Sequence, residues 1–238
     1  MKLLKIIAVI LFDLIDIYIH QKRIINFFHN RKILINYFVD VGAHKGSYTE
    51  LILSSNKKCK IMMFEPQKKY FNIIEKKFKK FNSIKVFNSA VSYKKGKKIL
   101  FINRHDVTSS LVGLNTNNFY LNLKARLFGT NAKGMISSKT KVNTVDLRSM
   151  LKKNRFKKVD LVKIDTEGHE YEVLKGLNKS IIHVKYILIE FHHNKIYPNY
   201  SPKKIHQYLI KNHFLLKQTY QFPLTTFEDR IYVNKLYK

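Results

Sequence analysis

The chain has 238 residues, 45% of them hydrophobic, with one cysteine and a formal net charge of +29. This length suits one sizeable core and is short for two, and a lone cysteine excludes an intrachain disulfide and a multi-cysteine zinc site. The charge is consistent with a polyanionic partner, but lysine outweighs arginine and is spread along the whole chain, so we favour a compositional bias.

Residues 1–37 are an apolar and basic N-terminal extension, for which we predict an amphipathic helix. Its apolar side chains recur at helical spacing, at Leu3, Ile6, Ile7, Ile10, Leu14 and Ile17. The apolar run 6–12 is too short to span a bilayer, and the aspartates that end it argue against a signal peptide. We expect a cytoplasmic protein and leave open whether this helix packs on the domain or makes peripheral membrane contact through residues 1–37.

A glycine-rich turn follows this extension. Residues 38–41 should end a buried strand, Gly42 and Gly46 bracket a tight turn, and a helix is expected from 47 to about 54. Glycines let the backbone approach a ligand closely, and a helix N-terminus offers free N–H groups and positive potential. The carboxylate of Asp40 would repel a pyrophosphate, so the turn suits a ligand that carries an amino group.

The next elements repeat at a regular spacing. We predict a strand at 60–65 that ends in an acid before a proline, a helix at 68–81 and a strand at 84–87. Asp40, Glu65 and Ala90 are equally spaced along the chain, as expected for βαβ units. In a parallel, doubly wound sheet, these residues meet in one crevice beyond the carboxyl ends of the strands.

Residues 93–145 break this rhythm and are predicted to be an inserted, substrate-facing segment. Segments of this size between sheet strands commonly carry function. We expect strands at 96–103 and 135–145. Between them, residues 103–118 are polar and turn-like, and residues 119–128 form either a strand or a helix.

Regular order returns in the C-terminal part of the chain. A helix should begin after Asp146, whose side chain suits an N-cap. We then expect strands at 159–165 and 185–191, each followed by a helix, at 166–176 and 201–212. The last two strands, 213–220 and 230–234, are close in sequence and suggest an antiparallel pair at the sheet edge. The pattern predicts an α/β fold with a doubly wound, mostly parallel sheet.

The acids at the strand ends narrow the choice of ligand. An acid that ends the second strand of a βαβ unit, as Glu65 does, binds ribose hydroxyls of dinucleotides and nucleosides alike. A dinucleotide fingerprint would have a glycine where His44 stands and no acid before the turn. The leading Asp40 instead fits S-adenosylmethionine, which carries an ammonium and a positive sulfonium. Together with the loop at Ala90 and with Asp165 at a later strand end, the pattern predicts this cofactor.

Two stretches are the most specific in the chain. Residues 39–48 contain the glycine turn, and 160–176 contain a Lys-Ile-Asp-x-Glu-Gly run that merges into Glu-x-x-Val-Leu-x-Gly. In both, the chain resembles the FkbM-type S-adenosylmethionine-dependent methyltransferases. Shorter matches at 64–66, 89–91, 109–111 and 189–190 support the resemblance, which covers about residues 38–235. It departs from the family at His44, where asparagine is usual.

The resemblance implies a class I methyltransferase with a Rossmann-like, seven-stranded sheet and an antiparallel last strand. The methyltransferase domain would be 38–238, with the inserted segment near 93–145. The family implies O-methylation of hydroxyls on sugars, on glycolipid or polysaccharide precursors or on other small molecules.

The resemblance also implies a role for each residue of the site. The methionine moiety would be held by the turn, at Asp40, Gly42, Ala43 and Gly46, with His44 in position to contact the ligand. Glu65, followed by Pro66, would bind the ribose, and Ser89 and Ala90 would flank the adenine. Asp165 would lie beside the sulfonium and the entering acceptor.

A hydroxyl acceptor benefits from a base within hydrogen-bonding reach. The candidates at strand ends are Asp165, Glu167, His169, Glu190, His192 and His193. We predict Asp165 with Glu167 as the first catalytic candidates and His169 as the second, although a helix N-terminus would favour an acid such as Glu167 without any catalysis. We assign no metal site, while a divalent ion at Asp165, Glu167 and Glu190 stays an alternative.

Two other functions are open. A nucleic-acid methyltransferase would account for the charge, but methylation of base amino groups typically uses an Asn/Asp-Pro-Pro-Tyr/Phe motif, which residues 165–168 lack, and no RNA-binding module is visible. A polyanion-binding or membrane-surface protein with a vestigial cofactor site would not need Asp40, Glu65 and Asp165 together. We therefore expect a small-molecule or glycan acceptor rather than nucleic acid, and leave the acceptor's identity and the oligomeric state open.

Overall fold

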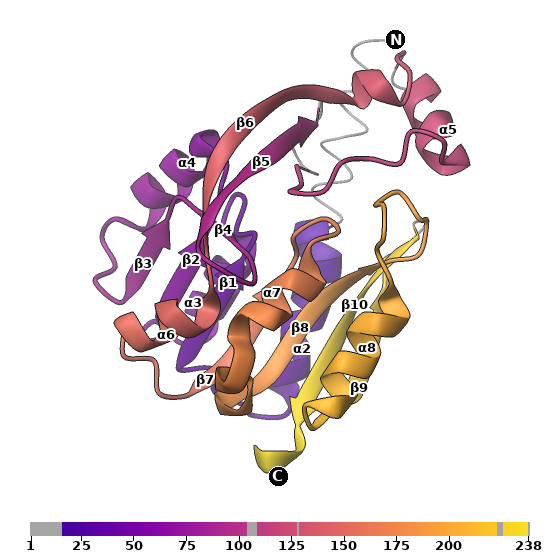
Figure 1. Cartoon of the computed structure of the whole chain (residues 1–238). Coiled ribbons are helices and arrows are strands. Elements are labelled where there is room, and N and C mark those ends of the chain that lie inside the picture. The colour runs from indigo at the N-terminus through magenta and orange to yellow at the C-terminus, as the bar shows by residue number, and fades with distance from the viewer. Residues whose placement is uncertain (1–15, 104–108, 128, 223–225, 238) are drawn as a thin grey trace.

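A computed structural model describes residues 16–103, 109–127, 129–222 and 226–237. Its centre is a seven-stranded sheet in the order β3-β2-β1-β7-β8-β10-β9 (Figure 1). The strands are β1 (Tyr37–Val41), β2 (Lys60–Phe64), β3 (Ile84–Phe87), β7 (Val159–Ile164), β8 (Val184–His192), β9 (Phe214–Gln221) and β10 (Phe227–Asn234). The five adjacent strands β3, β2, β1, β7 and β8 pair in parallel, and β10 is antiparallel to both of its neighbours. The mostly parallel, doubly wound sheet with an antiparallel last strand is confirmed.

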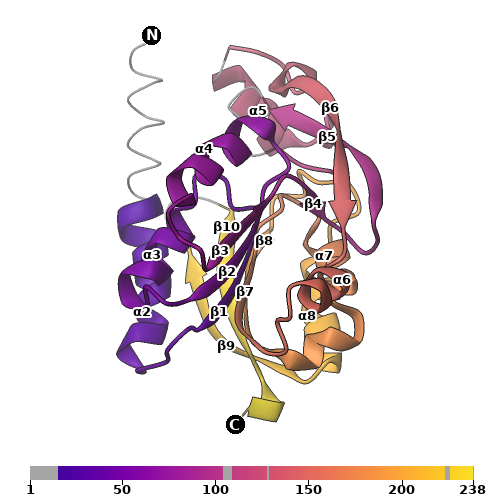
Figure 2. The ribbon, with the colours of Figure 1, turned by 90° about the vertical axis from the view of Figure 1, so that its left-hand side faces the viewer.

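Helices cover both faces of this sheet (Figure 2). On one face lie α2 (Lys22–Asn30), α3 (Ser47–Ser55) and α4 (Lys68–Phe78), and on the other lie α6 (Leu147–Lys153), α7 (Glu170–Leu177) and α8 (Pro202–Lys211). Because side chains alternate across a strand, Phe38 packs into the core beneath α2 and α3, while Val39 packs into the core beneath α6 and α7. Both faces are therefore apolar, which explains the nearly continuous hydrophobic strands.

The inserted segment adds a second, three-stranded sheet in the order β4-β6-β5. Its strands are β4 (Ala90–Val91), β5 (Gly96–Asn103) and β6 (Ile136–Val145), and β5 and β6 form a long antiparallel ribbon. The ambiguous segment 119–128 is mainly a helix, α5 (Phe119–Leu127), which lies with the short turn η2 (Lys133–Met135) at the far end of that ribbon (Figure 1). Ser110 pairs back onto Phe101 of β5 and brings the chain toward the main sheet.

Several predicted boundaries hold, and their caps explain why. Asp146 accepts a hydrogen bond from the Ser149 N–H at the start of α6, and Ser201 does the same for Lys204 at the start of α8. The helix predicted for 68–81 ends earlier, at Phe78.

The helix expected from residue 166 begins four residues later, at Glu170. Glu167 has a φ of 54° and Gly168 a φ of 95°, so the chain makes a tight turn before the helix. The carboxylate of Glu170 stabilises this turn, because its Oε1 accepts hydrogen bonds from the N–H and hydroxyl of Thr166 and from the N–H of Gly168. Glu167 is therefore not the N-terminal helix acid considered above.

The two C-terminal strands form the predicted antiparallel pair, but only β9 lies at the sheet edge. Strand β10 is inserted between β8 and β9. Burial accounts for this order, because Ile231, Tyr232 and Val233 of β10 are buried while most of β9 is not. Beyond β10, the short turn η4 (Lys235–Tyr237) ends the described chain.

Residues 16–30 of the N-terminal extension are helical, with a π-helical turn η1 (Asp16–Gln21) before α2. Ile24, Ile25, Phe27 and Phe28 of α2 are buried in the core shared with β1 and α3. The apolar positions predicted between Leu3 and Leu14 lie outside the described residues. In the part of the chain that the structure describes, no helix has both the length and the apolarity needed to cross a membrane. Membrane contact and a domain boundary at residue 38 stay predictions.

Candidate active site

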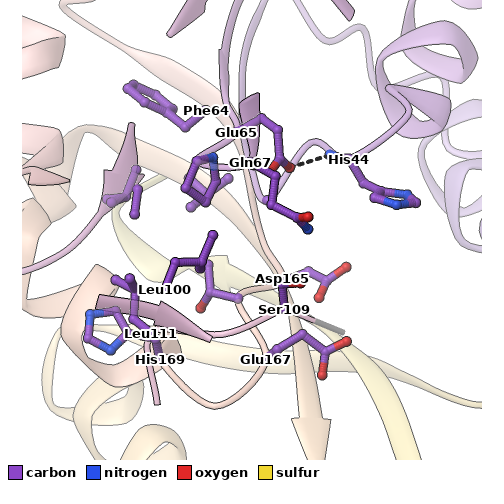
Figure 3. Close-up of a pocket in the computed structure, with 16 residues that line it drawn as sticks. His44, Phe64, Glu65, Gln67, Leu100, Ser109, Leu111, Asp165, Glu167 and His169 are labelled. Carbon is purple, nitrogen blue, oxygen red and sulfur yellow. Dashed lines mark hydrogen bonds between the residues drawn. The ribbon is translucent and has the colours of Figure 1, made fainter. Parts of the chain in front are cut away.

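A cavity lies where the carboxyl ends of β1, β2 and β7 meet the second sheet, as expected for a doubly wound sheet. The empty space within it, with the open mouth included, amounts to about 600 Å³. Of the predicted site residues, those that line it are Gly42, His44, Glu65, Pro66, Ala90, Asp165, Glu167 and His169 (Figure 3). Four others do not line it, namely Asp40, Ala43, Gly46 and Ser89.

The glycine turn forms one wall of the cavity. Gly42 has a φ of 78° and Gly46 a φ of 79°, in the left-handed region that favours glycine. A Cβ atom on Gly42 would lie 1.8 Å from the backbone oxygen of Asp165, so only glycine lets β1 and β7 end this close together. His44 is also left-handed, with a φ of 45°, and its ring lies against that of Tyr70 at a centroid distance of 3.9 Å.

Glu65 is held at the end of β2 by two backbone donors. Its Oε2 accepts a hydrogen bond from the His44 N–H at 2.9 Å (Figure 3), and its Oε1 accepts one from the Gln67 N–H at 2.8 Å. Burial raises the pKa of Glu65 to about 7, although these two donors act in the opposite direction. Each carboxylate oxygen has a second lone pair, so Glu65 can also accept hydroxyl groups from a ligand in the cavity.

A buried lysine, which the sequence interpretation did not single out, connects the strand ends. The Nζ of Lys163 donates to the backbone oxygen of Gly42 at 2.8 Å and lies 3.0 Å from Oδ2 of Asp165 and 3.8 Å from Oδ1 of Asp40. It also lies over the ring of Tyr48, 5.2 Å from its centroid. Burial alone would lower the pKa of Lys163, but the two aspartates raise it above its ordinary value. A lysine inside an apolar strand was the signal that could have revealed it.

Asp40 lies beneath the cavity instead of facing it. It is 1% exposed, and its Oδ2 accepts a hydrogen bond from the hydroxyl of Thr49 at 2.9 Å. Burial raises the pKa of this carboxyl group, and Lys163 lowers it. Direct contact between Asp40 and a ligand stays a prediction, because Lys163 stands beside it.

Asp165 and Glu167 present two carboxylates to the same side of the cavity (Figure 3). Their side chains are 33% and 16% exposed. The hydroxyl of Tyr197 donates to Oε2 of Glu167, and the hydroxyl of Ser110 donates to its backbone oxygen. Burial raises the pKa of Glu167 to about 7, while the nearby His192 lowers it and Asp165 raises it.

His169 lies on the other side of the cavity, beside Leu111 (Figure 3). Its Nε2 is 3.0 Å from the hydroxyl oxygen of Ser92. Burial, with smaller contributions from Lys98 and Lys175, lowers the pKa of this imidazole to about 3, so the ring is neutral at physiological pH. A catalytic role for His169 stays a prediction.

Two further residues at the end of β8 approach Glu167. The Nε2 of His192 is 3.0 Å from Oε2 of Glu190 and 3.8 Å from Oε2 of Glu167. Burial raises the pKa of Glu190; burial alone would lower that of His192, but the neighbouring carboxylates raise it to about 10. His193 instead lies at the surface and pairs with Glu228 at 3.0 Å. The sequence analysis grouped Glu167 and Glu190 with Asp165 as an alternative site for a divalent ion, and the fold instead brings Glu167, Glu190 and His192 together.

The composition of the cavity fits S-adenosylmethionine. Apolar side chains at one end, Phe64, Leu100 and Leu111, can flank an adenine, and Glu65 lies where a ribose would follow. At the other end is Asp165, whose partly exposed carboxylate suits a cationic ligand group.

Comparison with known proteins gives a consistent result. The family model of the methyltransferase FkbM domain matches residues 40–222. A hexuronic acid methyltransferase, AglP of Haloferax volcanii, is 33% identical over 51 residues, which is 21% of each chain.

Solved structures resemble the fold. The FkbM methyltransferase from Methylobacillus flagellatus superposes with a TM-score of 0.53 and 13% identity, over 84% of this chain and 43% of the other. A methyltransferase from Aquifex aeolicus has a TM-score of 0.48 and 14% identity, over 92% and 93%. The chain thus spans less than half of the first structure and about a fifth of the curated relative.

Proposed function

The chain belongs to the methyltransferase FkbM family, and from this premise we propose that it is an O-methyltransferase that acts on a hydroxyl group of a sugar, a glycolipid or polysaccharide precursor or another small molecule. S-adenosylmethionine is the methyl donor. One observation carries the proposal: Asp165 and Glu167 present partly exposed carboxylates to the same side of the cofactor cavity, next to the glycine turn.

The residues around the cavity divide the work of binding. Glu65 would accept the ribose hydroxyls, since two backbone N–H groups already fix its orientation and leave lone pairs available. Phe64, Leu100 and Leu111 would exclude water around the adenine. Gly42 lets the ends of β1 and β7 meet at the cavity wall, next to which the methionine end would lie.

When bound, the cofactor supplies a methyl group on a positive sulfur, so that the chain must place an acceptor oxygen in line with it. Asp165 would accept the proton of that hydroxyl as the oxygen is methylated. Lys163 holds Oδ2 of Asp165 at 3.0 Å and so orients the carboxylate toward the cavity. Glu167 provides a second carboxylate that can bind a neighbouring hydroxyl of the same acceptor.

A sugar acceptor is favoured by two observations. The local similarity to a hexuronic acid methyltransferase concerns an enzyme named for a sugar acid. The acceptor side of the cavity carries the carboxylates of Asp165 and Glu167, which can accept hydrogen bonds from the hydroxyl groups of a sugar.

The test is calorimetry with S-adenosylmethionine and S-adenosylhomocysteine, followed by an assay of S-adenosylhomocysteine release with hexuronic acid glycosides, neutral glycosides and RNA. We expect cofactor binding that Glu65→Ala weakens, and turnover with a glycoside. The matched control is Glu172→Ala, which removes an acid paired with Lys175 outside the cavity. Absence of cofactor binding to folded protein would refute the proposal, and turnover with RNA alone would refute its acceptor class.

A further inference from the structure

Three side chains from two strand ends converge beside the cofactor cavity. Glu190 and His192 are two residues apart in β8 and so point to the same face, and Glu167 reaches them from the turn after β7. One potential ligand atom of each lies within 4.8 Å of the other two. The closest pairs are Nε2 of His192 with the Oε2 atoms of Glu190 and Glu167, at 3.0 and 3.8 Å.

Two of the three central atoms of this cluster lack a hydrogen bond of acceptable geometry among the described residues, whereas Oε2 of Glu167 accepts one from Tyr197. The side chain of His192 is only 6% exposed, yet neither its Nε2 nor Oε2 of Glu190 has a hydrogen bond of acceptable geometry among the described residues. Buried polar atoms are normally satisfied, so a set of them that faces one point indicates a missing partner. An ordinary ion pair would satisfy one carboxylate, and here two carboxylates face a single imidazole.

The spacing and donor types match a metal ion. Ligand atoms that surround a tetrahedral zinc ion at about 2.1 Å lie about 3.4 Å from one another, which falls between the two closest distances here. One imidazole and two carboxylates suit Mn²⁺, Fe²⁺ or Zn²⁺ better than Ca²⁺, which prefers oxygen ligands alone. We propose that Glu167, Glu190 and His192 form a binding site for a divalent transition-metal ion.

The surroundings support such a site. The hydroxyl of Tyr197 donates to the carboxylate of Glu167, and the rings of Tyr197 and Tyr200 pack against His192 with centroids 5.0 and 5.5 Å away. These contacts restrict the orientation of the ligands, as outer-shell residues do in known metal sites. Three protein ligands leave at least one coordination position for water or for a substrate oxygen.

The position of the site gives it a function in the reaction, and this part of the inference rests on the proposed function. Glu167 lines the cavity together with Asp165, so an ion at Glu167 lies next to the residue proposed to take the proton. The ion can hold an oxygen of the acceptor, and two neighbouring oxygens of a sugar or sugar acid would bind better than one.

The experiment uses the full chain, treated with chelator and dialysed, and measures Mn²⁺ binding by electron paramagnetic resonance and Zn²⁺ binding by calorimetry, without cofactor or acceptor. We expect one ion per chain, and at least tenfold weaker binding in Glu190→Gln and in Glu167→Gln. Glu228→Gln is the control, because Glu228 lies outside the cluster and forms a Glu–His pair of the same length with the exposed His193, besides its pair with Arg230. Mn²⁺ should also raise the melting temperature of the wild type and of Glu228→Gln more than that of the other two variants.

Two results would overturn the inference: no saturable binding by the wild type, or an equal loss of affinity in Glu228→Gln. Should Glu190→Gln fail to fold, Glu167→Gln carries the same prediction. Cofactor binding is measured separately in the presence of chelator. If the cofactor binds and the metals do not, the metal site is wrong while the proposed methyltransferase activity stands.

Discussion

Replacing Lys163 by methionine tests how the strand ends are held together. The substitution keeps the length of the side chain and removes the cation that lies 3.0 Å from Asp165 and 3.8 Å from Asp40. Asp40 is 1% exposed, so it would become a buried charge without a cationic partner, held only by the hydroxyl of Thr49. Breaking a buried ion pair by removing one partner costs about 3–5 kcal/mol. We expect a loss of this size in the free energy of unfolding, a large share of the 5–15 kcal/mol typical of a domain.

The assay is urea denaturation of the full chain followed by circular dichroism. The loss should shrink at pH 5 relative to pH 8, because an aspartate that lacks its cation becomes protonated and no longer carries a buried charge. The double variant Lys163→Met with Asp40→Asn should recover at least about 1 kcal/mol, since the two side chains interact directly. Lys60→Met is the matched control, because Lys60 is an exposed lysine in strand β2 of the same sheet.

A loss below about 1 kcal/mol for Lys163→Met, the same as in Lys60→Met, would refute the reasoning, because exposed substitutions usually stay within about 0.5 kcal/mol. A loss that does not depend on pH would also refute it. In that case, packing of the methylene chain and not the charge would account for the contribution of Lys163.

Three further predictions concern the cavity. Gly42→Ala should lower the free energy of unfolding in urea by about 2–4 kcal/mol, because of the left-handed backbone and the clash with Asp165. Gly96→Ala is the control and should lower it by less than about 1 kcal/mol, since its Cβ would lie 3.6 Å from Thr144 Oγ1. Similar losses in the two variants would contradict this prediction. The pKa of Glu65 is raised to about 7, so below this pH the free protein takes up a proton that ribose binding must release. Calorimetry should then show that the affinity for S-adenosylhomocysteine falls by up to about tenfold for each unit by which the pH is lowered below about 7. Glu65→Gln should abolish this pH dependence of the affinity, and a dependence retained in the variant would exclude Glu65 as its cause. Asp165→Asn should lower kcat about 100-fold or more in the release assay while cofactor affinity changes less than about tenfold, and an unchanged kcat would exclude Asp165 as the base.

Much of the fold was predictable because the strands carry strong local signals. Both faces of the sheet are covered by helices, so the strands are apolar throughout and stand out from the lysine-rich helices. Parallel connectivity then places the strand ends on one edge, which put Glu65 and Asp165 in one cavity. The sheet order at the C-terminus was less accessible, because the sequence indicates that β9 and β10 pair but not which of them pairs with β8.

The contacts within the site depend on the register in which the strands pair, which cannot be read from the sequence. Asp40 of β1 pairs directly with Lys163 of β7, and this pairing turns Asp40 into the partner of a buried cation. The helix signal at residues 166–176 likewise concealed the turn at Glu167 and Gly168, because Glu170 serves as the acceptor for the preceding backbone donors. Tertiary contacts made over long sequence separations decided both outcomes.

This turn gives two nearby acids different partners. Asp165 lies at the end of β7 and is paired with Lys163, a cation that the chain itself supplies. Two residues later, Glu167 has a positive φ, and its side chain reaches Glu190 and His192 on β8. In this cluster the carboxylates outnumber the imidazole, whereas Asp165 has a fixed cationic neighbour. The first acid is therefore suited to accept a proton in a set orientation, and the second to share a positive ligand that comes from solution.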